Sequence, residues 1–439
     1  MNTATSYLDS LLQGRPPASA LSWLNRLRAH AVDRVGALTV PTTRDEDWRF
    51  TDISPLTKLS FQPALSAAQP AQEAQPLAPA VLEPWAIGEA AARLVFVDGI
   101  YTPQHSFNRA GMTVENLAAG LPRHGAAVQA QLGRLAAYER NAFAALNTAF
   151  LHDGALIVAP RDLAVAAPLH LLFIATRKHA ASYPRVLLIA EPGSKLTLVE
   201  DYVALQDGAY FTNAVTEIAL GANARLQHVR VQREGAEAFH IANCAVSLAH
   251  ASRYHAVSVA LGARISRHNL GVALAAEGAE CSIDGLALIG GRQLADTHTL
   301  IDHAVPQCLS RQLHKCIVDG AAHAVFNGNV MVRAGAQRTD SAQSSRNLLL
   351  SGKARVDTKP QLEIFADDVK CAHGATVGQL DLDEVFYLKS RGLSETAARN
   401  LLTYAFGAEV IERIPVASLR QRLEASVLAQ TQGITEPRP

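Results

Sequence analysis

The sequence predicts a mainly β protein with helical regions at both ends, and three observations lead to that fold class. From about Ala155 to about residue 380, apolar side chains alternate with a period of two, which is the spacing of β-strands. No helical segment of ten or more residues separates these strands, so a doubly wound α/β sheet would lack its covering helices. Near both termini the apolar residues follow helical spacing. A sandwich, a barrel and a solenoid all satisfy these observations.

Pairs of glycine and alanine favour the solenoid among these three architectures. Such pairs begin at positions 221, 262, 278, 320, 335 and 374, so long and short intervals alternate and the pattern repeats about every 57 residues. Small residues at regular intervals are typical of stacked coils that turn at the same corners. We therefore expect a β-helix core over residues 155–380.

The N-terminal region, residues 1–154, is predicted to be largely helical. Leucines at helical spacing, interrupted by glycine and prolines, indicate two short helices in the first forty residues. Residues 60–84 are rich in proline, alanine and glutamine and are expected to form a linker. The alternation of Leu94–Thr102 around Asp-Gly indicates a hairpin arm, and Ala126–Phe150 has helical periodicity.

The C-terminal segment, residues 381–439, returns to helical spacing. Three amphipathic stretches follow one another, at residues 383–394, 395–414 and 417–430. Ser394 is expected to be the N-cap of the second stretch. The ordinary role of these helices would be to cap the open end of the solenoid, because stacked coils expose apolar edges there.

Composition excludes several classes of protein. Forty basic and forty acidic residues give zero formal net charge, so we do not expect a nucleic-acid binder. No stretch reaches the roughly 18 uninterrupted apolar residues of a membrane helix, and the first residues lack a signal-peptide pattern. We therefore expect a cytoplasmic protein without membrane contact. Its five cysteines are then expected to be reduced thiols rather than disulfides.

Cys371 and His373 form the motif with the clearest chemistry. Side chains two residues apart in a strand point to the same face, so a thiolate and an imidazole can bind one ion or cluster together. Two ligands complete no metal site, and the rest must come from elsewhere, including another subunit. The ordinary alternative is that Cys371 is a small buried apolar residue and His373 a turn or core residue.

Other histidines, cysteines and acids lie in the same strand-rich region. Asp302 and His303 are adjacent, so in a strand they face opposite ways, and the spacings match no closed zinc site. We expect ordinary cross-strand or surface roles here. His314 and Cys316 are two residues apart and can share a face, so they stay as second candidates for metal binding. The residues considered are Asp296, His298, Asp302, His303, Cys308, His314, Cys316 and His323.

Four motifs resemble the SufD branch of the SufB/SufD family of iron–sulfur cluster assembly proteins. They read PTTRDEDWRFTDISPL from Pro41, TDSAQSSRNLLLS from Thr339, TKPQLEIFADDVKCAHGAT from Thr358 and FYLKSRG from Phe386. The resemblance implies a right-handed parallel β-helix flanked by helical regions. It also implies a scaffold subunit of the SUF (SufBCD) complex that is not itself an enzyme.

The same resemblance implies partners and site residues. It places His373 first and Cys371 second at an interface with a SufB-like subunit, where a transient iron–sulfur cluster is shared. No cofactor is expected to stay tightly bound to the isolated chain. A SufC-like ATPase would supply nucleotide energy, since this chain has no P-loop sequence. It would dock on C-terminal helix residues Phe386, Leu388, Leu401, Leu402, Tyr404 and Phe406.

Two departures from SufB assign this chain to the partner role. SufB has a cysteine where this chain has Ser345, and it reads His-Glu-Ala-Thr where this chain has His373-Gly374-Ala375-Thr376. A thiolate and a carboxylate would then come from SufB. Because the last strand of a solenoid has an unpaired edge, the isolated chain is also expected to form a homodimer.

Two alternatives from other classes stay open. A β-helix carbohydrate-active enzyme would line a groove with acidic and aromatic residues, whereas only 6% of this chain is aromatic. A purely structural solenoid would bind a partner without metal. It differs from the scaffold only in whether Cys371 and His373 ever contact iron.

Overall fold

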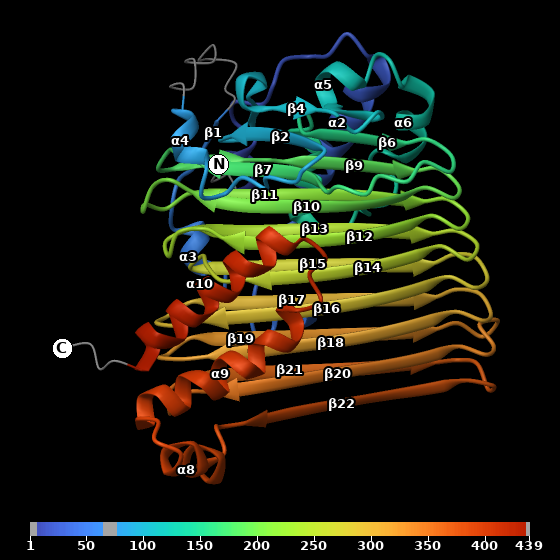
Figure 1. Ribbon diagram of the computed structural model, residues 1–439. Coiled ribbons are helices and arrows are strands. Elements are labelled where there is room, and N and C mark those ends of the chain that lie inside the picture. Colours follow the sequence, from blue (N-terminus) through green and yellow to red (C-terminus); the bar gives the residue numbers. More distant parts are fainter. Residues whose placement is uncertain (1–6, 65–76, 436–439) are drawn as a thin grey trace.

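A computed structural model, which describes residues 7–64 and 77–435, confirms the mainly β fold class (Figure 1). Two sheets of eleven strands each face one another in a parallel β-solenoid, and helices flank it at both ends of the chain. Successive strands alternate between the sheets, so each long strand is hydrogen-bonded to the strand two places further along. The solenoid is therefore the right architecture among the three predicted.

Sheet one lies beneath the N-terminal helices. From the last coil to the first, the order of its long strands is β21, β19, β17, β15, β13, β11, β9, β6 and β5, with β8 beside β11 and β1 beside β8. The strands are β1 (Gln62–Pro63), β5 (Thr113–Asn116), β6 (Ala155–Ala159), β8 (Ala180–Ser182), β9 (Arg185–Ala190), β11 (Phe211–Leu220), β13 (Phe239–Leu248), β15 (Ile265–Leu274), β17 (Leu294–His303), β19 (His323–Val332) and β21 (Arg355–Ile364).

Sheet two forms the opposite wall of the solenoid. Its order is β22, β20, β18, β16, β14, β12, β10, β7, β2 and β3, with β4 beside β2. The strands are β2 (Ala92–Val97), β3 (Ile100–Tyr101), β4 (Phe107–Asn108), β7 (Leu169–Ala175), β10 (Lys195–Ala204), β12 (Arg225–Arg233), β14 (Arg253–Ala260), β16 (Glu280–Ile289), β18 (Leu309–Val318), β20 (Asp340–Leu349) and β22 (Lys370–Gly378).

The coils repeat at about half the predicted interval. Phe239 of β13 pairs with Ile265 of β15, and His323 of β19 pairs with Arg355 of β21, so one coil separates each residue from its partner. The predicted repeat therefore spans two coils. Each coil has two turns, one from sheet one to sheet two and one back to sheet one. The Gly-Ala pairs of the predicted repeat that fall in turns lie in the first turn of one coil and in the second turn of the next, so among them the same turn carries a pair only in every second coil.

The core of the solenoid follows from the period-two pattern. In β13 the inward side chains Ala242, Cys244, Val246 and Leu248 are buried against inward side chains of the neighbouring strands. The apolar residues of the interior form a large cluster that includes this row and a smaller one that includes Ala287, Cys316 and Val318. Each fully buried valine or leucine contributes about 1.5–3 kcal/mol to folding.

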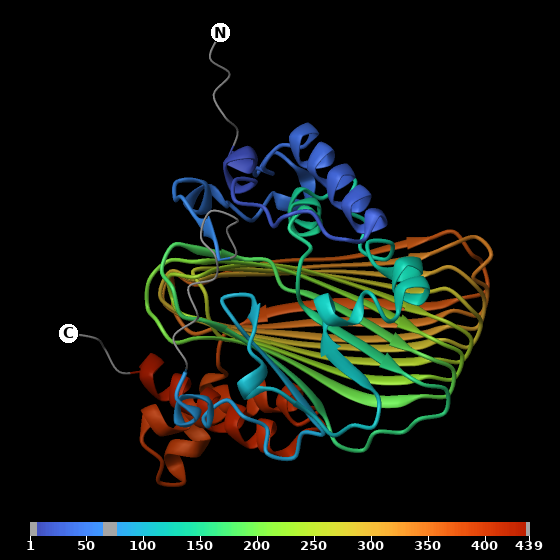
Figure 2. The same cartoon turned by 90° about the horizontal axis from the view of Figure 1, so that it is seen from above.

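The N-terminal helices pack on the outer face of sheet one, except for the short helix at Pro79–Leu82, whose Leu82 is buried with Val95 and Leu172 of sheet two (Figure 2). Outward aromatic residues of the sheet, Phe211 and Phe239, meet Phe143 of the helical layer and Phe61. This region contains α1 (Tyr7–Leu11), α2 (Ser22–Ala37), η1 (Glu46–Trp48), α3 (Ser54–Thr57), α4 (Pro79–Leu82), η2 (Pro103–His105), α5 (Leu117–Gly120), α6 (Gly125–Gln131) and α7 (Ala142–Ala149).

A buried ion pair also holds this layer on the sheet. Arg185 Nη2 lies 2.5 Å from Glu217 Oε2, and both side chains are fully buried. Glu217 also accepts hydrogen bonds from the backbone N–H groups of Gly133, Leu135 and Ala136 at 2.9–3.0 Å. Loss of one partner would leave an uncompensated buried charge, which costs about 3–5 kcal/mol.

The N-terminal region differs from its prediction in three places. Two helices fill the first forty residues as predicted, but the helical stretch Ala126–Phe150 is interrupted at residues 132–141, where backbone N–H groups bind Glu217 instead of helical carbonyls. The predicted hairpin is present as β2 and β3, yet β2 also pairs in parallel with β7 and so joins the solenoid. The predicted linker contains β1 residues and α4, while its residues 65–76 lie outside the described residues.

The C-terminal helices are α8 (Leu382–Ser390), α9 (Glu395–Ile411) and α10 (Ala417–Thr435). Ser394 Oγ accepts a hydrogen bond from the backbone N–H of Ala397 at 3.1 Å, so the predicted N-cap is confirmed. Helices α9 and α10 lie along the outer face of sheet two (Figures 1 and 2). None of the helices in the described ranges is long and apolar enough to cross a membrane.

The expectation that these helices cap the end of the solenoid is wrong. Ile411 and Leu419 are buried with Val199, Val229 and other outward apolar side chains of sheet two. The apolar stripe of the helices therefore lies on the side of the solenoid, where a matching apolar surface exists. The last coil stays uncovered at its end (Figure 1).

Candidate functional site

The C-terminal end of the solenoid is open because β21 and β22 form the last coil. Within the described ranges, β21 pairs only with β19 and β22 only with β20. Eight of the nine residues of β22 are exposed, whereas the inward residues Ser341, Gln343 and Ser345 one coil earlier are at most 3% exposed. The free N–H and C=O groups of this coil can pair with a strand of another chain.

Cys371 and His373 lie on the same face of β22, as their spacing predicts. Cys371 pairs with Ser341 and His373 pairs with Gln343, both of which point into the solenoid. Cys371 is half-buried and packs against the interior apolar cluster, while His373 is exposed. Both residues thus belong to the inner surface of the last coil, which a further coil would cover.

The Cys371 thiol is protonated at neutral pH. Burial raises the pKa of this thiol above its usual range, and the nearby carboxylate of Asp340 raises the pKa further. Arg311 Nη2 lies 2.9 Å from Asp340 Oδ2 and so neutralises that carboxylate in part. Because the thiolate is the form that binds metal, a cluster bound at Cys371 would have to displace this proton.

A cavity of about 490 Å³ adjoins His373 on the side of α9. Its lining includes Arg346 of β20 and Glu409 of α9, whose charged atoms lie 3.4 Å apart. Glu409 also forms an ion pair with Lys315 of β18, and Lys315 Nζ donates to the carbonyl of Phe406 at 2.9 Å. These contacts join α9 to the two strands next to the last coil.

Sequence reasoning missed Arg346 and Glu409. Arg346 pairs with Thr376 of β22, so the spacing of a single coil would have placed Arg346 next to the last coil. The predicted repeat concealed that neighbour, because it spans two coils and passes over the coil between them. No sequence signal places Glu409 there, because its position depends on the docking of α9 on sheet two.

Below His373 the interior of the solenoid carries a column of hydrogen-bonded polar side chains. Gln343 Nε2 donates to Gln312 Oε1 at 2.7 Å, and Gln312 Nε2 donates to Thr299 Oγ1 at 2.9 Å. All three side chains are buried. Buried amides need such partners, since an unpaired one costs about 1–3 kcal/mol. His373 is thus the exposed end of this row, in which the buried Gln343 Oε1 has no hydrogen-bond partner among the described residues.

The second metal candidates, His314 and Cys316, share the inner face of β18 as predicted but behave as core residues. Burial lowers the pKa of His314 to about 4 and raises the pKa of Cys316 to about 12. The His314 ring stacks on Phe326 with centroids 4.5 Å apart. Among the described residues, no three His, Cys, Asp or Glu side chains are grouped closely enough to hold a metal ion.

Asp296 and His298 serve the contact between sheet one and the N-terminal layer. Asp296 Oδ2 lies 2.5 Å from Arg267 Nη1 and accepts a hydrogen bond from Thr51 Oγ1 at 2.5 Å. His298 Nε2 lies 3.0 Å from the other carboxylate oxygen. Burial alone would raise the pKa of Asp296, but Arg267 and His298 lower it to about 2.

The remaining predicted histidines and acids have ordinary cross-strand roles. Asp302 accepts a hydrogen bond from Arg333 Nε at 2.9 Å, while the adjacent His303 faces inward and contacts Ser310 at 2.9 Å. His323 and Asp357 pair across neighbouring strands at 2.7 Å. Cys308 is buried with its Sγ 3.5 Å from two backbone carbonyl oxygens. These residues are separate from Cys371 and His373.

Ser345, where SufB has a cysteine, lies inside the solenoid. Its Oγ accepts hydrogen bonds from Asn347 Nδ2 at 3.1 Å and from Thr358 Oγ1 at 3.0 Å. The side chain is 1% exposed and sits one coil below the open end, since Ser345 pairs with Ala375 of β22. In this chain the position contributes a hydrogen bond to the core.

The six predicted docking residues of the C-terminal helices fall into three groups. Phe386 of α8 and Leu401 of α9 are exposed, as are Leu382 and Tyr387 of α8. Leu388 and Leu402 are half-buried. Tyr404 and Phe406 pack against the apolar cluster between the helices and sheet two. Of the six predicted docking residues, Phe386 and Leu401 are therefore the two that are exposed to solvent.

Two models of one protein family match this chain. The model described as the SufBD protein N-terminal region matches residues 1–171, and the model of the SUF system FeS cluster assembly SufBD core domain matches residues 173–406. The second match spans the solenoid from β7 onward together with α8 and most of α9. Together the two matches cover most of the chain.

Curated relatives agree with the family models. A SufBD family protein of Synechocystis is 40% identical over 427 residues, which are 92% of this chain and 90% of that protein. The SufD protein of Escherichia coli is 34% identical over 397 residues, 88% of each chain. The chloroplastic protein ABCI7 of Arabidopsis thaliana is 30% identical over 445 residues, 96% of this chain and 88% of that protein. The chain therefore belongs to the SufBD family of iron–sulfur cluster assembly proteins and is SufD-like, which replaces the alternative of a carbohydrate-active enzyme.

Proposed function

We propose that this chain is a non-catalytic scaffold subunit of a cytoplasmic iron–sulfur cluster assembly complex, in which it pairs with a SufB-like subunit and a SufC-like ATPase. One observation carries the proposal. The open last coil presents free strand edges next to a cysteine and a histidine that share a face. The nascent cluster is the product shared between subunits, and the isolated chain holds no cofactor tightly.

The strand edges of the last coil support pairing with a second solenoid. A related SufB-like chain would end in a similar coil, and its edge would complete the hydrogen bonds that β21 and β22 leave unmade. Each such bond contributes about 0.5–1.5 kcal/mol net. Without that partner, the last coil of a second copy of this chain can pair with the same free strand edges. We therefore propose that the isolated protein forms a homodimer with His373 at or near its interface.

His373 and Cys371 would supply two ligands to a cluster at that interface. Cluster irons accept thiolate sulfur and imidazole nitrogen. His373 ranks first because it is exposed, whereas the Cys371 thiol is half-buried and protonated. In a reducing cytoplasm the thiol stays available. The remaining ligands would come from the SufB-like partner, because the described part of this chain brings no third residue to the pair.

The exposed apolar side chains Phe386 and Leu401 support docking of the ATPase on α8 and α9. Movement of a docked subunit would act directly on α9. Glu409 of α9 is paired with Lys315 and Arg346, so α9 is tied to β18 and β20, the strands below β22. The scaffold thus offers a short mechanical route from the ATPase to the last coil.

The test is co-expression with SufB-like and SufC-like partners, comparing wild type, His373→Ala and the control His250→Ala. His250 is an exposed histidine in a turn away from the last coil. We expect all three complexes to assemble, with normal iron and absorbance in wild type and control and loss of cluster in His373→Ala.

Assembly should be measured first by size-exclusion chromatography, since loss of the complex would also remove the cluster. A His373→Ala complex that assembles and contains the full iron content would contradict the ligand role. The chain would then be the purely structural solenoid of the remaining alternative, which binds its partners without contact to iron.

A further inference from the structure

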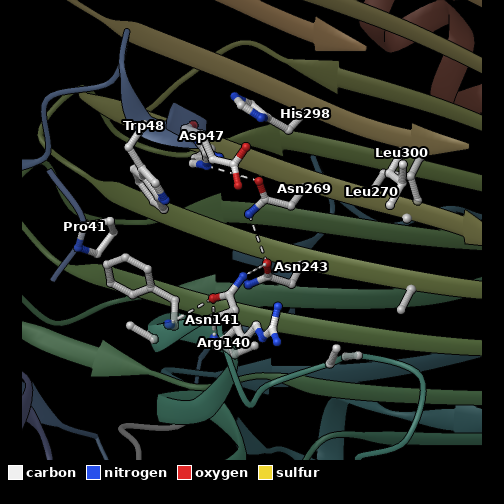
Figure 3. A pocket seen from close by; sticks show the side chains of 18 of the residues that line it. Pro41, Asp47, Trp48, Arg140, Asn141, Asn243, Asn269, Leu270, His298 and Leu300 are labelled. Atoms are coloured by element: carbon white, nitrogen blue, oxygen red, sulfur yellow. Dashed lines mark hydrogen bonds between the residues drawn. The ribbon is translucent and has the colours of Figure 1, made fainter. Parts of the chain in front are cut away.

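A second cavity, of about 810 Å³, lies on the outer face of sheet one (Figure 3). Its walls are η1 on one side and the loop that leads into α7 on the other. Pockets that hold small molecules measure about 300–1,000 Å³, so the cavity has the size of a ligand site. Nothing in the proposed cluster chemistry uses it, because Cys371 and His373 lie on the inner side of the other sheet.

Several amide side chains line this cavity. Along β13 the outward residues change from Phe239 and Ile241, which are covered by the N-terminal layer, to Asn243 and Ala245. We call this cavity the amide groove, after the amide residues that line it, Asn141, Asn243, Asn269, Asn327, Asn329 and Gln361.

One of these amides has an unused donor. Asn243 Oδ1 accepts two hydrogen bonds, from Asn141 Nδ2 and Asn269 Nδ2, each at 3.0 Å. Its Nδ2 has no partner among the described residues, although the side chain lines the groove and is only 8% exposed. An unsatisfied buried donor costs about 1–3 kcal/mol, and an acceptor on a bound molecule would remove that cost.

Opposite charges stand at the two ends of a row of these amides. Figure 3 shows a row that runs from Asp47 through Asn269, Asn243 and Asn141 to Arg140. In the described ranges the Asp47 carboxylate and the Arg140 guanidinium have no hydrogen bond or ion pair, and both residues are exposed.

Two other charged residues of the groove are already neutralised. Arg267 is paired with Asp296 at 2.5 Å, and Glu46 is paired with Lys359 at 3.0 Å. Asp45 also lines the groove; its carboxylate has no ion pair in the described ranges but accepts hydrogen bonds from the backbone N–H and the hydroxyl of Thr42. The charges without any such partner are therefore one anion, Asp47, and one cation, Arg140, separated by groups that both donate and accept hydrogen bonds.

We propose that the amide groove binds a short extended stretch of peptide that carries a positive charge at one end and a negative charge at the other. Amide side chains match the donors and acceptors of peptide groups. Asp47 would receive the cationic end, and Arg140 would hold the carboxylate end through its planar fork of donors. A neutral sugar would leave both charges unused, and a dianion such as a phosphate ester would be repelled by Asp47.

The same chemistry has two sources. A free tripeptide carries the charges at its termini, whereas an internal segment of a partner protein carries them on a lysine and an aspartate. We would titrate the full-length protein with triglycine, with acetyl-triglycine amide and with acetyl-Lys-Gly-Gly-Asp-amide by isothermal calorimetry. Binding of triglycine alone assigns the groove to free peptides, and binding of the capped Lys-Asp peptide alone assigns it to a protein segment.

The variants Asp47→Asn and Arg140→Gln test the two ends separately. Each should weaken binding about fivefold, the effect of one exposed charge contact. The controls Asp33→Asn and Arg134→Gln remove exposed charges outside the groove and should leave binding unchanged. The exchange Asp47→Arg with Arg140→Asp should restore binding, because a peptide can lie in the reverse direction along a row of amides.

Two results would overturn the proposal. The first is absence of binding for all three peptides at millimolar peptide concentrations. The second is binding that is unaffected by both single variants, or that stays as weak in the exchange variant as in either of them. Thermal unfolding of each variant should be measured alongside, so that a folding defect is recognised; Asp47 and Arg140 are exposed and are expected to have little effect on it.

Discussion

The middle coils and the last coil share one backbone repeat but differ in what their inward side chains do. Cys316 and Cys371 are both inward cysteines of sheet two. Cys316, with strands on both sides, is fully buried, and its thiol has a pKa raised to about 12. Cys371, with a strand on one side only, is half-buried. The position of its coil in the solenoid, rather than the type of residue, therefore decides whether an inward side chain is buried in the core or accessible to solvent.

The largest expected contrast is between two phenylalanines. Phe326→Ala in β19 removes a fully buried ring and should lower the free energy of unfolding by about 3–5 kcal/mol. Phe365→Ala, directly after β21, removes a ring that is 64% exposed and should change stability by no more than about 0.5 kcal/mol. Urea unfolding monitored by circular dichroism would measure both. Equal losses would show that the last coil is as closely packed as the middle ones.

The second contrast concerns pH. His314 has a pKa of about 4 in the folded protein, because it is buried, against about 6.5 when unfolded. Between these pH values the unfolded chain binds more protons than the folded protein. The free energy of unfolding is therefore not reduced by His314 above about pH 6.5, and it falls by about 3 kcal/mol as the pH is lowered toward 4. His303, whose pKa is also lowered to about 4, acts in the same direction.

The variant His314→Gln should lose this contribution. Its free energy of unfolding should therefore fall less steeply between pH 6.5 and 4.5 than that of wild type, in urea titrations at several pH values. Parallel slopes for the two proteins would mean that His314 does not titrate with folding and that the interior of the middle coils admits charge.

The third contrast lies within the open end itself. Phe386→Ser should weaken capture of a SufC-like ATPase about 30-fold, the effect of losing a contact worth about 2 kcal/mol. Val377→Ser on β22 is the matched control, since Val377 is also exposed but lies on the proposed SufB-like edge. Surface plasmon resonance with each partner would separate the two. Equal weakening of ATPase capture by both variants would contradict separate docking surfaces.

The smallest expected effect is a difference in the rates at which the cysteines react with an alkylating reagent. In the native protein, iodoacetamide should modify Cys371 before the fully buried Cys316 and Cys281, whose thiols have pKa values raised to about 12. The rate at Cys371 should rise with pH, because burial also raises its pKa and only the thiolate reacts. Peptide mass spectrometry would show the order. A SufB-like partner should protect Cys371, and early modification of Cys316 would indicate opening of the middle coils.

Much of the fold could be predicted because local patterns match local structure. Alternation predicted the strands, helical spacing predicted the N- and C-terminal helices, and Ser394 predicted the start of α9. The break in the helical stretch at residues 132–141 could not be predicted. It depends on Glu217, which lies far along the chain and whose carboxylate takes over the backbone N–H groups there.

The candidate site was predictable only in part for the same reason. A period of two places Cys371 and His373 on one face, and this needs no knowledge of the rest of the molecule. Glu409 reaches the neighbouring strands only because α9 docks on the side of sheet two. The amide groove unites residues from η1, the loop before α7 and five strands, and no local pattern relates them.

The sequence by itself determined the period of the strands, the helical ends, the shared face of Cys371 and His373 and the family to which the chain belongs. Tertiary structure alone decided that the C-terminal helices cover the side of the solenoid and leave its end open, that His314 and Cys316 are core, and that His373 meets solvent. The reason is physical. Alternation is a property of neighbours along the chain, whereas burial and pKa depend on which coil or helix lies against a residue in space.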